Sequence, residues 1–271
     1  MRGPILLRFS PVHAKATGKT AFLTCAPCDR VADCGKRRVS HWTILCDFDG
    51  TISVEDITDS LLVRFARPGW EDIELAWKCG EIGSRECMER QIALLDVSRA
   101  ELDAHLDRMT IDRDFAAFSA AVDEAKLPMT VLSDGLDYSI RRILGRHGLA
   151  RLPVAANHLI ACGERSWRLE FPYAKDDCRS GNCKCASAGD ARAERRRVLV
   201  IGDGASDFCV SGVADFVFAK HRLVEHCRAA GIAHVRIGGF ADALALLPRL
   251  IAGELGASHA APKPLPSLRV A

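Results

Sequence analysis

The sequence predicts an α/β protein: a doubly wound parallel sheet with a Rossmann-like core and a small helical cap inserted after the first strand. Two observations favour this fold. Short apolar runs alternate with amphipathic helical patterns, as they do in parallel sheets. Three of these runs end in polar loops. Because ligands of open α/β sheets bind outside the carboxyl ends of the strands, these loops are expected to form one site.

Four segments have the composition of short buried strands, namely residues 43–47, 129–133, 197–201 and 214–218. A helix is predicted for residues 137–147, since its apolar side chains recur with the helical period. Residues 159–161 and 166–171 favour a β-hairpin on the edge of the sheet. We therefore assign residues 42–56 and 123–255 to the core domain.

Residues 57–122 interrupt this alternation with helical periodicity and no good strand. Leu61, Leu62 and Phe65 form one apolar face of a predicted helix. An insertion directly after the first strand is placed to cover the loop at the end of that strand. We expect residues 57–122 to form a helical cap that acts as a lid.

The two ends of the chain differ from the rest. Residues 1–41 are basic and lack a helical or alternating period, and residues 256–271 are rich in Ala and Pro. Both are expected to be disordered, the first as a leader and the second as a tail. Cys25, Cys28 and Cys34 include one C-x-x-C spacing, but no fourth ligand with matching spacing follows, so a leader is favoured over a zinc site.

The charge balance excludes some classes of partner. The 271 residues include 37 basic and 35 acidic side chains, a formal net charge of +2, without the clustered basic excess of nucleic-acid-binding proteins. No apolar run reaches the length of a membrane span. We expect a small-molecule partner, no nucleic-acid or membrane partner, and a monomer or a homodimer.

The chain contains twelve cysteines, yet it is too long to be a small disulfide-stapled module. Cys46, Cys209 and Cys227 lie in apolar runs and are expected to be buried, reduced thiols. The protein is accordingly expected to be cytoplasmic. Zinc binding by a second group of cysteines is the less favoured alternative to free thiols, because their spacing does not match common zinc motifs. This group comprises Cys162, Cys178, Cys183 and Cys185.

Asp47 and Asp49 are two residues apart just past the first predicted strand. Positions i and i+2 share one face of a strand, so both carboxylates can reach a common site. Two close carboxylates suit a hard cation such as Mg²⁺, and one can act as a nucleophile while the other transfers a proton. Gly50 allows a tight turn here.

A second acidic loop, Gly202–Asp207, follows the third strand. Asp203 can complete the oxygen shell of a metal ion, and Asp207 can orient that shell. Ser133 ends the second strand, where its hydroxyl and the N–H of Asp134 can hold a phosphoryl oxygen. Lys184 can neutralise charge on a nucleophile and a phosphate.

These motifs, taken together and in this order, resemble the four motifs of the haloacid-dehalogenase superfamily over residues 43–235. The resemblance implies that Asp47 attacks phosphorus and that Asp49 is the general acid and base. It also implies Mg²⁺ held by Asp47, the backbone carbonyl of Asp49 and Asp203. An acid at position 49 separates the phosphatases and phosphomutases of this superfamily from the dehalogenases, so the resemblance implies a phosphatase or a phosphomutase.

The helical insertion resembles the phosphoserine-phosphatase-like branch. That branch implies a substrate contact for Glu55, but Gln91 stands where the branch has a carboxylate-binding arginine. The resemblance is closer to the methionine-salvage phosphatases of 2-hydroxy-3-keto-5-methylthiopentenyl 1-phosphate, which also place a cysteine directly before the lysine, as in Cys183-Lys184. Phosphoserine, phosphoethanolamine, phosphocholine and pyridoxal phosphate remain alternative substrates, and a non-catalytic phosphate sensor remains an alternative function.

Overall fold

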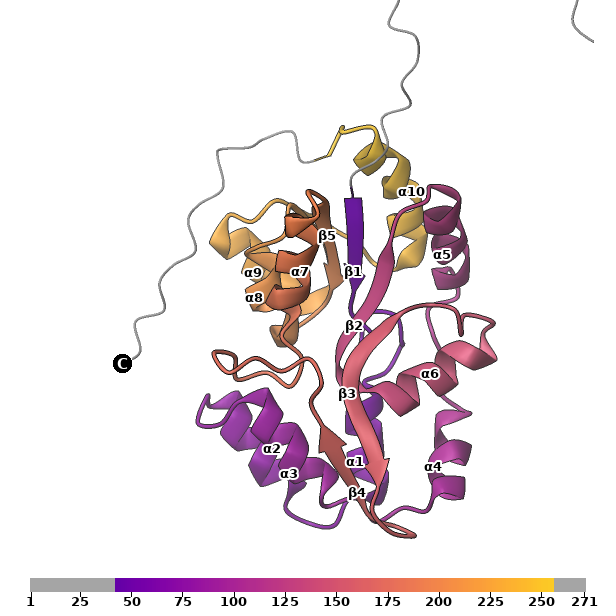
Figure 1. The fold of residues 1–271 in the computed structure, drawn as a ribbon, viewed down its shortest axis with the longest axis vertical. Helices are drawn as coiled ribbons and strands as arrows, with labels where there is room; N and C mark the ends of the chain where they lie inside the picture. Colours follow the sequence, from indigo (N-terminus) through magenta and orange to yellow (C-terminus); the bar gives the residue numbers. More distant parts are fainter. Residues whose placement is uncertain (1–41, 256–271) are drawn as a thin grey trace, which may run out of the picture. The chain divides into compact units, whose positions relative to one another are not determined.

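The computed structural model describes residues 42–255, in which seven strands form one sheet (Figure 1). The strand order is β4-β3-β2-β1-β5-β6-β7, and every neighbouring pair is parallel except β3 and β4. The strands are β1 (Trp42–Cys46), β2 (Met129–Leu136), β3 (Val154–Ala161), β4 (Trp167–Glu170), β5 (Arg197–Gly202), β6 (Phe216–Ala219) and β7 (His234–Arg236).

The side chains of the central strands are buried on both faces of the sheet, which explains their nearly continuous apolar sequences. In β1, Ile44 and Cys46 belong to one core cluster, whereas Leu45 belongs to the cluster on the opposite face. This alternation follows from the two-residue period of a strand. A sheet buried in this way needs a layer of helices on each face.

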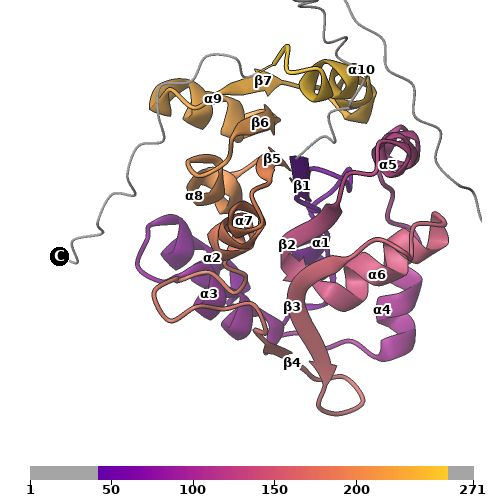
Figure 2. The same ribbon diagram turned by 45° about the horizontal axis from the view of Figure 1, so that its top comes forward.

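Helices supply these two layers (Figures 1 and 2). α7 (Lys184–Ala193), α8 (Phe208–Ser211) and α9 (His221–Ala230) cover one face, and α5 (Phe115–Glu124), α6 (Asp137–Arg146) and α10 (Phe240–Ile251) cover the other. Phe240 of α10 packs against Phe115 and Phe118 of α5 with ring centroids 4.7 and 5.2 Å apart. The described residues therefore form the predicted doubly wound α/β fold.

The remaining helices lie between β1 and β2 in the sequence. They are α1 (Ile57–Phe65), α2 (Trp70–Lys78), α3 (Ser84–Ile92) and α4 (Arg99–Leu106). Ser53 forms an antiparallel bridge with Ile111, so the chain enters and leaves this helical insertion at adjacent positions. The division into a core and a cap at residues 57–122 stays a prediction; α5, which includes the end of that range, packs beside the sheet on α10.

The predicted strands and the edge hairpin are confirmed with small shifts at their ends, and β3 pairs with β4 in the hairpin. The helix predicted for residues 137–147 is α6. β7 was not predicted, because a three-residue strand is too short to show a period. The prediction for Cys209 was wrong: Cys46 and Cys227 are buried, but Cys209 is exposed on α8.

The predicted leader (1–41), with Cys25, Cys28 and Cys34, and the predicted tail (256–271) lie outside the described residues. Among residues 42–255, no helix combines the length and the apolar character needed to cross a membrane.

Candidate active site

The candidate site lies at the carboxyl ends of the three central strands. β1 lies between β2 and β5, so the loops that follow these strands are neighbours. The backbone N–H of Asp47 donates to the carbonyl of Ile201 at 2.8 Å, which continues the ladder between β1 and β5 to the first residue of the loop. The position of Asp47 is therefore fixed by the sheet.

Lys184 connects the loops through an ion-pair network. Its Nζ donates to Asp47 Oδ1 at 2.6 Å and to Asp207 Oδ1 at 2.7 Å. The three side chains are almost completely removed from solvent, at 5%, 6% and 1% exposure respectively. Burial alone would lower the pKa of Lys184, but the carboxylates of Asp207 and Asp47 raise it well above its ordinary value. Lys184 is thus a permanent cation against Asp47.

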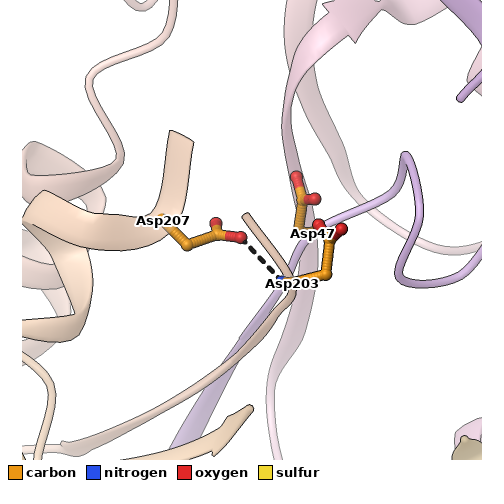
Figure 3. A group of neighbouring side chains, drawn as sticks. All are labelled: Asp47, Asp203 and Asp207. Carbon is orange, nitrogen blue, oxygen red and sulfur yellow. Dashed lines mark hydrogen bonds between the residues drawn. The ribbon is translucent and has the colours of Figure 1, made fainter. Parts of the chain in front are cut away.

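Asp207 has a structural task as well as its ion pair. Its Oδ2 accepts the backbone N–H of Asp203 at 3.1 Å, as Figure 3 shows. A Cβ added to Gly202 would lie 2.2 Å from Asp207 Oδ2, so only glycine leaves room for this contact. Asp207 thus contacts both Lys184 and the backbone of Asp203, and its predicted role of orienting the metal shell stays a prediction.

The carboxylate of Asp49 contacts a different set of groups from that of Asp47. Its Oδ1 accepts the backbone N–H of Ile57 at 2.9 Å, and its Oδ2 accepts a 3.5 Å contact from the Ser133 hydroxyl. Burial raises the pKa of Asp49 to about 6, and the Asp203 carboxylate also raises it, whereas the Ile57 N–H lowers it. A carboxyl with such a pKa can both donate and accept a proton near neutral pH.

The carboxylates can hold a metal ion. Asp47, Asp203 and Asp207 each offer an oxygen within 4.8 Å of the others. Figure 3 shows the Asp47 and Asp203 carboxylates side by side. Gly50 has a positive φ of 68°, and a Cβ there would lie 2.7 Å from Asp203 Oδ2, so glycine keeps the acidic loops in close contact. An all-oxygen set fits a hard divalent cation.

Ser133 and Asp134 end up in different environments. The Ser133 hydroxyl accepts the backbone N–H of Gly135 at 2.9 Å and faces Asp49. The Asp134 carboxylate accepts the Ser84 hydroxyl at 2.5 Å and the Asn182 N–H at 2.8 Å. Asp134 therefore connects the core to the amino terminus of α3, and its backbone N–H remains the group proposed to bind phosphate.

The structure places Glu55 and Gln91 away from these hydrogen bonds. Glu55 is exposed just before α1. Gln91 is 2% exposed, and its Nε2 donates to Glu74 Oε2 at 3.0 Å and to the carbonyl of Trp70 at 3.4 Å. The Gln91 side chain thus joins α3 to α2. A contact of either residue with substrate stays a prediction.

Sequence reasoning missed Lys220. This side chain is 7% exposed, and its Nζ donates to the carbonyls of Gly50 at 2.9 Å and Thr51 at 3.1 Å. It therefore holds the loop that carries Asp47 and Asp49. Its position at the end of a predicted strand, next to the acidic loops, was the available signal.

Two arginines, also missed, join the insertion to the segment before Lys184. Arg85 Nη2 donates to the carbonyls of Lys175 and Cys178 at 2.8 Å each. Arg179 donates in return to the carbonyls of Gly80 at 3.2 Å and Glu81 at 3.0 Å. We call these reciprocal contacts the arginine clasp. They hold α3 over the loop that leads to Lys184.

A cavity of about 540 Å³ lies beside this clasp and reaches Lys184 and Ser206. Trp77, Ile82 and Ser84 line it from the insertion. Cysteines line the opposite wall together with Arg222. The cavity is large enough for a small metabolite.

Comparison with known proteins agrees with this geometry. The family model of the haloacid dehalogenase-like hydrolases matches residues 44–211. A 2-hydroxy-3-keto-5-methylthiopentenyl-1-phosphate phosphatase of Exiguobacterium sp. is 31% identical over 206 residues, covering 73% of this chain and 94% of the relative. The phosphatase of the same name from Geobacillus kaustophilus is 30% identical over 214 residues, covering 76% and 96%.

Solved structures show the same fold. A substrate-bound phosphoserine phosphatase complex has a TM-score of 0.58 at 19% identity and covers 76% of this chain and 96% of its own. A probable phosphoserine phosphatase from Vibrio cholerae has a TM-score of 0.59 at 18% identity, covering 79% and 67%. At these identities the likeness concerns the fold alone.

The protein therefore belongs to the haloacid dehalogenase-like hydrolase family. Within that family it is a phosphatase, which is one of the two classes that Asp49 implied.

Lys220 provides a test of the loop geometry. Replacing Lys220 with Met leaves the buried carbonyls of Gly50 and Thr51 without their charged donor, which we expect to lower the free energy of unfolding by about 1–3 kcal/mol. Urea denaturation measures this loss. Lys78→Met is the control, because Lys78 is 59% exposed and its surface ion pair with Glu74 contributes at most about 1 kcal/mol. Equal effects of the two variants would contradict the role of Lys220.

Proposed function

We propose that this phosphatase is a Mg²⁺-dependent phosphomonoesterase that forms a phosphoaspartate at Asp47 and acts on 2-hydroxy-3-keto-5-methylthiopentenyl 1-phosphate. The observation that carries the mechanism is the contact of Lys184 with Asp47 at 2.6 Å in a buried site. The substrate is inferred from the relatives of about 30% identity.

Asp47 is the proposed nucleophile. Burial raises the pKa of its carboxyl, and the Lys184 ammonium opposes this rise. With Oδ1 held by Lys184, the second oxygen of the carboxylate is left for the attack. In-line attack of this oxygen on phosphorus forms the acyl phosphate and releases the alcohol.

The transferred phosphoryl group carries negative charge that the site must balance. Lys184 supplies one positive charge, and the Ser133 hydroxyl with the Asp134 N–H supplies hydrogen bonds. Asp47, Asp203 and the backbone carbonyl of Asp49 would hold Mg²⁺, which neutralises phosphoryl charge when bound. Asp207 keeps Asp203 in place through the backbone hydrogen bond at 3.1 Å.

Asp49 is the proposed general acid and base. Its pKa of about 6 allows it to protonate the leaving alkoxide and then to remove a proton from the attacking water. The contact with Ile57 N–H ties Asp49 to the start of α1, so the position of the acid is set by the junction between the core and the insertion.

The insertion favours a small substrate without an amino-acid carboxylate. By sequence resemblance, the arginine of the phosphoserine enzymes falls near Gln91, whose amide donates to Glu74. The adjacent Arg90 donates to Glu86. Arg85, from the same helix, donates to the backbone carbonyls of Lys175 and Cys178 as part of the arginine clasp. All three side chains have other partners in this arrangement, which favours a neutral keto phosphate over phosphoserine.

We first predict the effect of removing the nucleophile. Asp47→Asn should lower turnover of an aryl phosphate by on the order of a thousandfold or more, because an amide is a poor nucleophile. Circular dichroism should show a folded variant. Asp123→Asn, the same change in a surface ion pair with Arg151, is the matched control and should retain activity. Substantial turnover by folded Asp47→Asn would exclude Asp47 as the nucleophile.

The effect of replacing Asp49 should depend on the leaving group of the substrate. Asp49→Asn should slow hydrolysis of an alkyl phosphate by roughly 10²–10⁴-fold. Release of the phenol from an activated aryl phosphate should be slowed much less, because a good leaving group needs little protonation. Rapid-quench experiments should trap phosphoenzyme in this variant.

The rate difference between the native enzyme and Asp49→Asn on alkyl phosphates should depend on pH. The proton-donating form of Asp49 is present below pH about 6 and is lost as the pH rises through that value. The ratio of the native rate to the Asp49→Asn rate on alkyl phosphates should therefore be largest below pH about 6. Equal losses on both substrate types at every pH would rule out acid catalysis by Asp49.

Metal removal should stop the reaction. EDTA is expected to abolish turnover and Mg²⁺ to restore it, because an oxygen-only site binds this ion well. Ca²⁺ should inhibit, since its larger and looser coordination shell disturbs in-line geometry. Full activity after thorough chelation would remove the metal from the mechanism.

Substrate choice is tested by comparing kcat/KM for phosphoserine and for the methylthio-keto phosphate on one preparation. A missing charged contact to a buried carboxylate costs roughly 2–5 kcal/mol, so phosphoserine should be poorer by at least about thirtyfold. A preference for phosphoserine would overturn the proposed substrate while leaving the phosphatase assignment intact.

A further inference from the structure

Four cysteines line the cavity beside Lys184, out of nine in the described residues. They are Cys178, Cys183, Cys185 and Cys209. All are free thiols, and Cys209 is exposed to solvent. The proposed chemistry uses none of them, so their presence around one cavity requires another explanation.

Cys185 and Cys209 form a pair within this group. Cys185 directly follows Lys184 on α7, and Cys209 lies on α8 two residues after Asp207. α7 packs against α8, and both thiols line the same cavity. The pair therefore joins α7, which begins at Lys184, to α8, which begins directly after Asp207.

A soft metal ion would require the thiols to converge on one point. Among residues 42–255, the only set of three metal-ligating side chains with atoms within 4.8 Å of one another is the acidic set of the active site. No three of the cavity thiols converge in this way, which favours a bond between two sulfur atoms over a thiolate metal centre.

We propose that Cys185 and Cys209 are a site of reversible oxidation, at which a peroxide forms a disulfide that switches the active site off. The peroxide oxygen–oxygen bond breaks as the exposed Cys209 sulfur becomes a sulfenic acid and one water leaves. The Cys185 sulfur then displaces the sulfenic hydroxyl, and the second water leaves. Two thiols are oxidised and one peroxide is reduced.

The expected effect on the enzyme follows from the geometry of Lys184. A disulfide brings the sulfur atoms to about 2.05 Å, much closer than two thiols in contact, and so moves α7 relative to α8. Lys184 is the first residue of α7 and has hydrogen bonds of 2.6 and 2.7 Å to Asp47 and Asp207. Displacing such a group by about 1 Å can cost about a hundredfold in rate. This effect rests on the proposed function, whereas the disulfide itself does not.

Peptide mapping tests the bond directly. After treatment of the full chain with hydrogen peroxide and blocking of free thiols, trypsin separates the four cysteines into peptides 176–179, 180–184, 185–192 and 198–220. The proposal predicts that peptide 185–192 is linked to peptide 198–220 and that dithiothreitol releases both. A link between Cys178 and Cys183 alone, or no link, would overturn it, whether or not the protein is active.

Activity measurements test the switch. Peroxide should lower kcat for an aryl phosphate by at least about tenfold, and dithiothreitol should restore it. Cys209→Ser should keep its activity under peroxide, whereas Cys79→Ser, which removes an exposed thiol outside the cavity, should remain as sensitive as the native chain. Inactivation of Cys209→Ser at the native rate, or a complete disulfide with unchanged kcat, would refute control by this pair.

Discussion

The buried ammonium of Lys184, held between Asp47 and Asp207, is the interaction on which the site depends. Each of the three residues comes from a different segment: the end of β1, the start of α7 and the loop after β5. A buried charge without a partner is strongly destabilising, so none of the three can leave its position without a cost to the other two. The network therefore fixes the relative positions of these segments as well as the charge at the nucleophile.

Lys220 performs a comparable task from the opposite side. It carries a second buried positive charge next to an acidic site, but it donates to backbone carbonyls rather than to carboxylates. The two lysines thus have different roles. Lys184 sets the electrostatics of Asp47, and Lys220 sets the path of the loop that carries Asp47 and Asp49.

The fold was largely predictable because each central strand is buried on both faces and ends in a polar loop. The same property explains why Asp47, Asp203 and Asp207 could be grouped from the sequence, since strand ends meet at one edge, whereas Lys184 was grouped with them through the family resemblance. The role of Lys220 was not predicted, because a single lysine usually lies on the surface. The Ser84–Asp134 contact joins residues 50 positions apart, on a helix whose orientation no local pattern specifies.

The bridge between Ser53 and Ile111 brings the two ends of the helical insertion together. A segment whose two ends are adjacent can be lengthened, shortened or exchanged without changing the register of the sheet. Under the proposed function, the core loops carry the phosphate chemistry, and the insertion lines the neighbouring cavity with Trp77, Ile82 and Ser84. Relatives with one reaction and different substrates can diverge by altering the insertion alone, and a chimera that exchanges residues 54–110 between two such enzymes would be expected to transfer substrate preference.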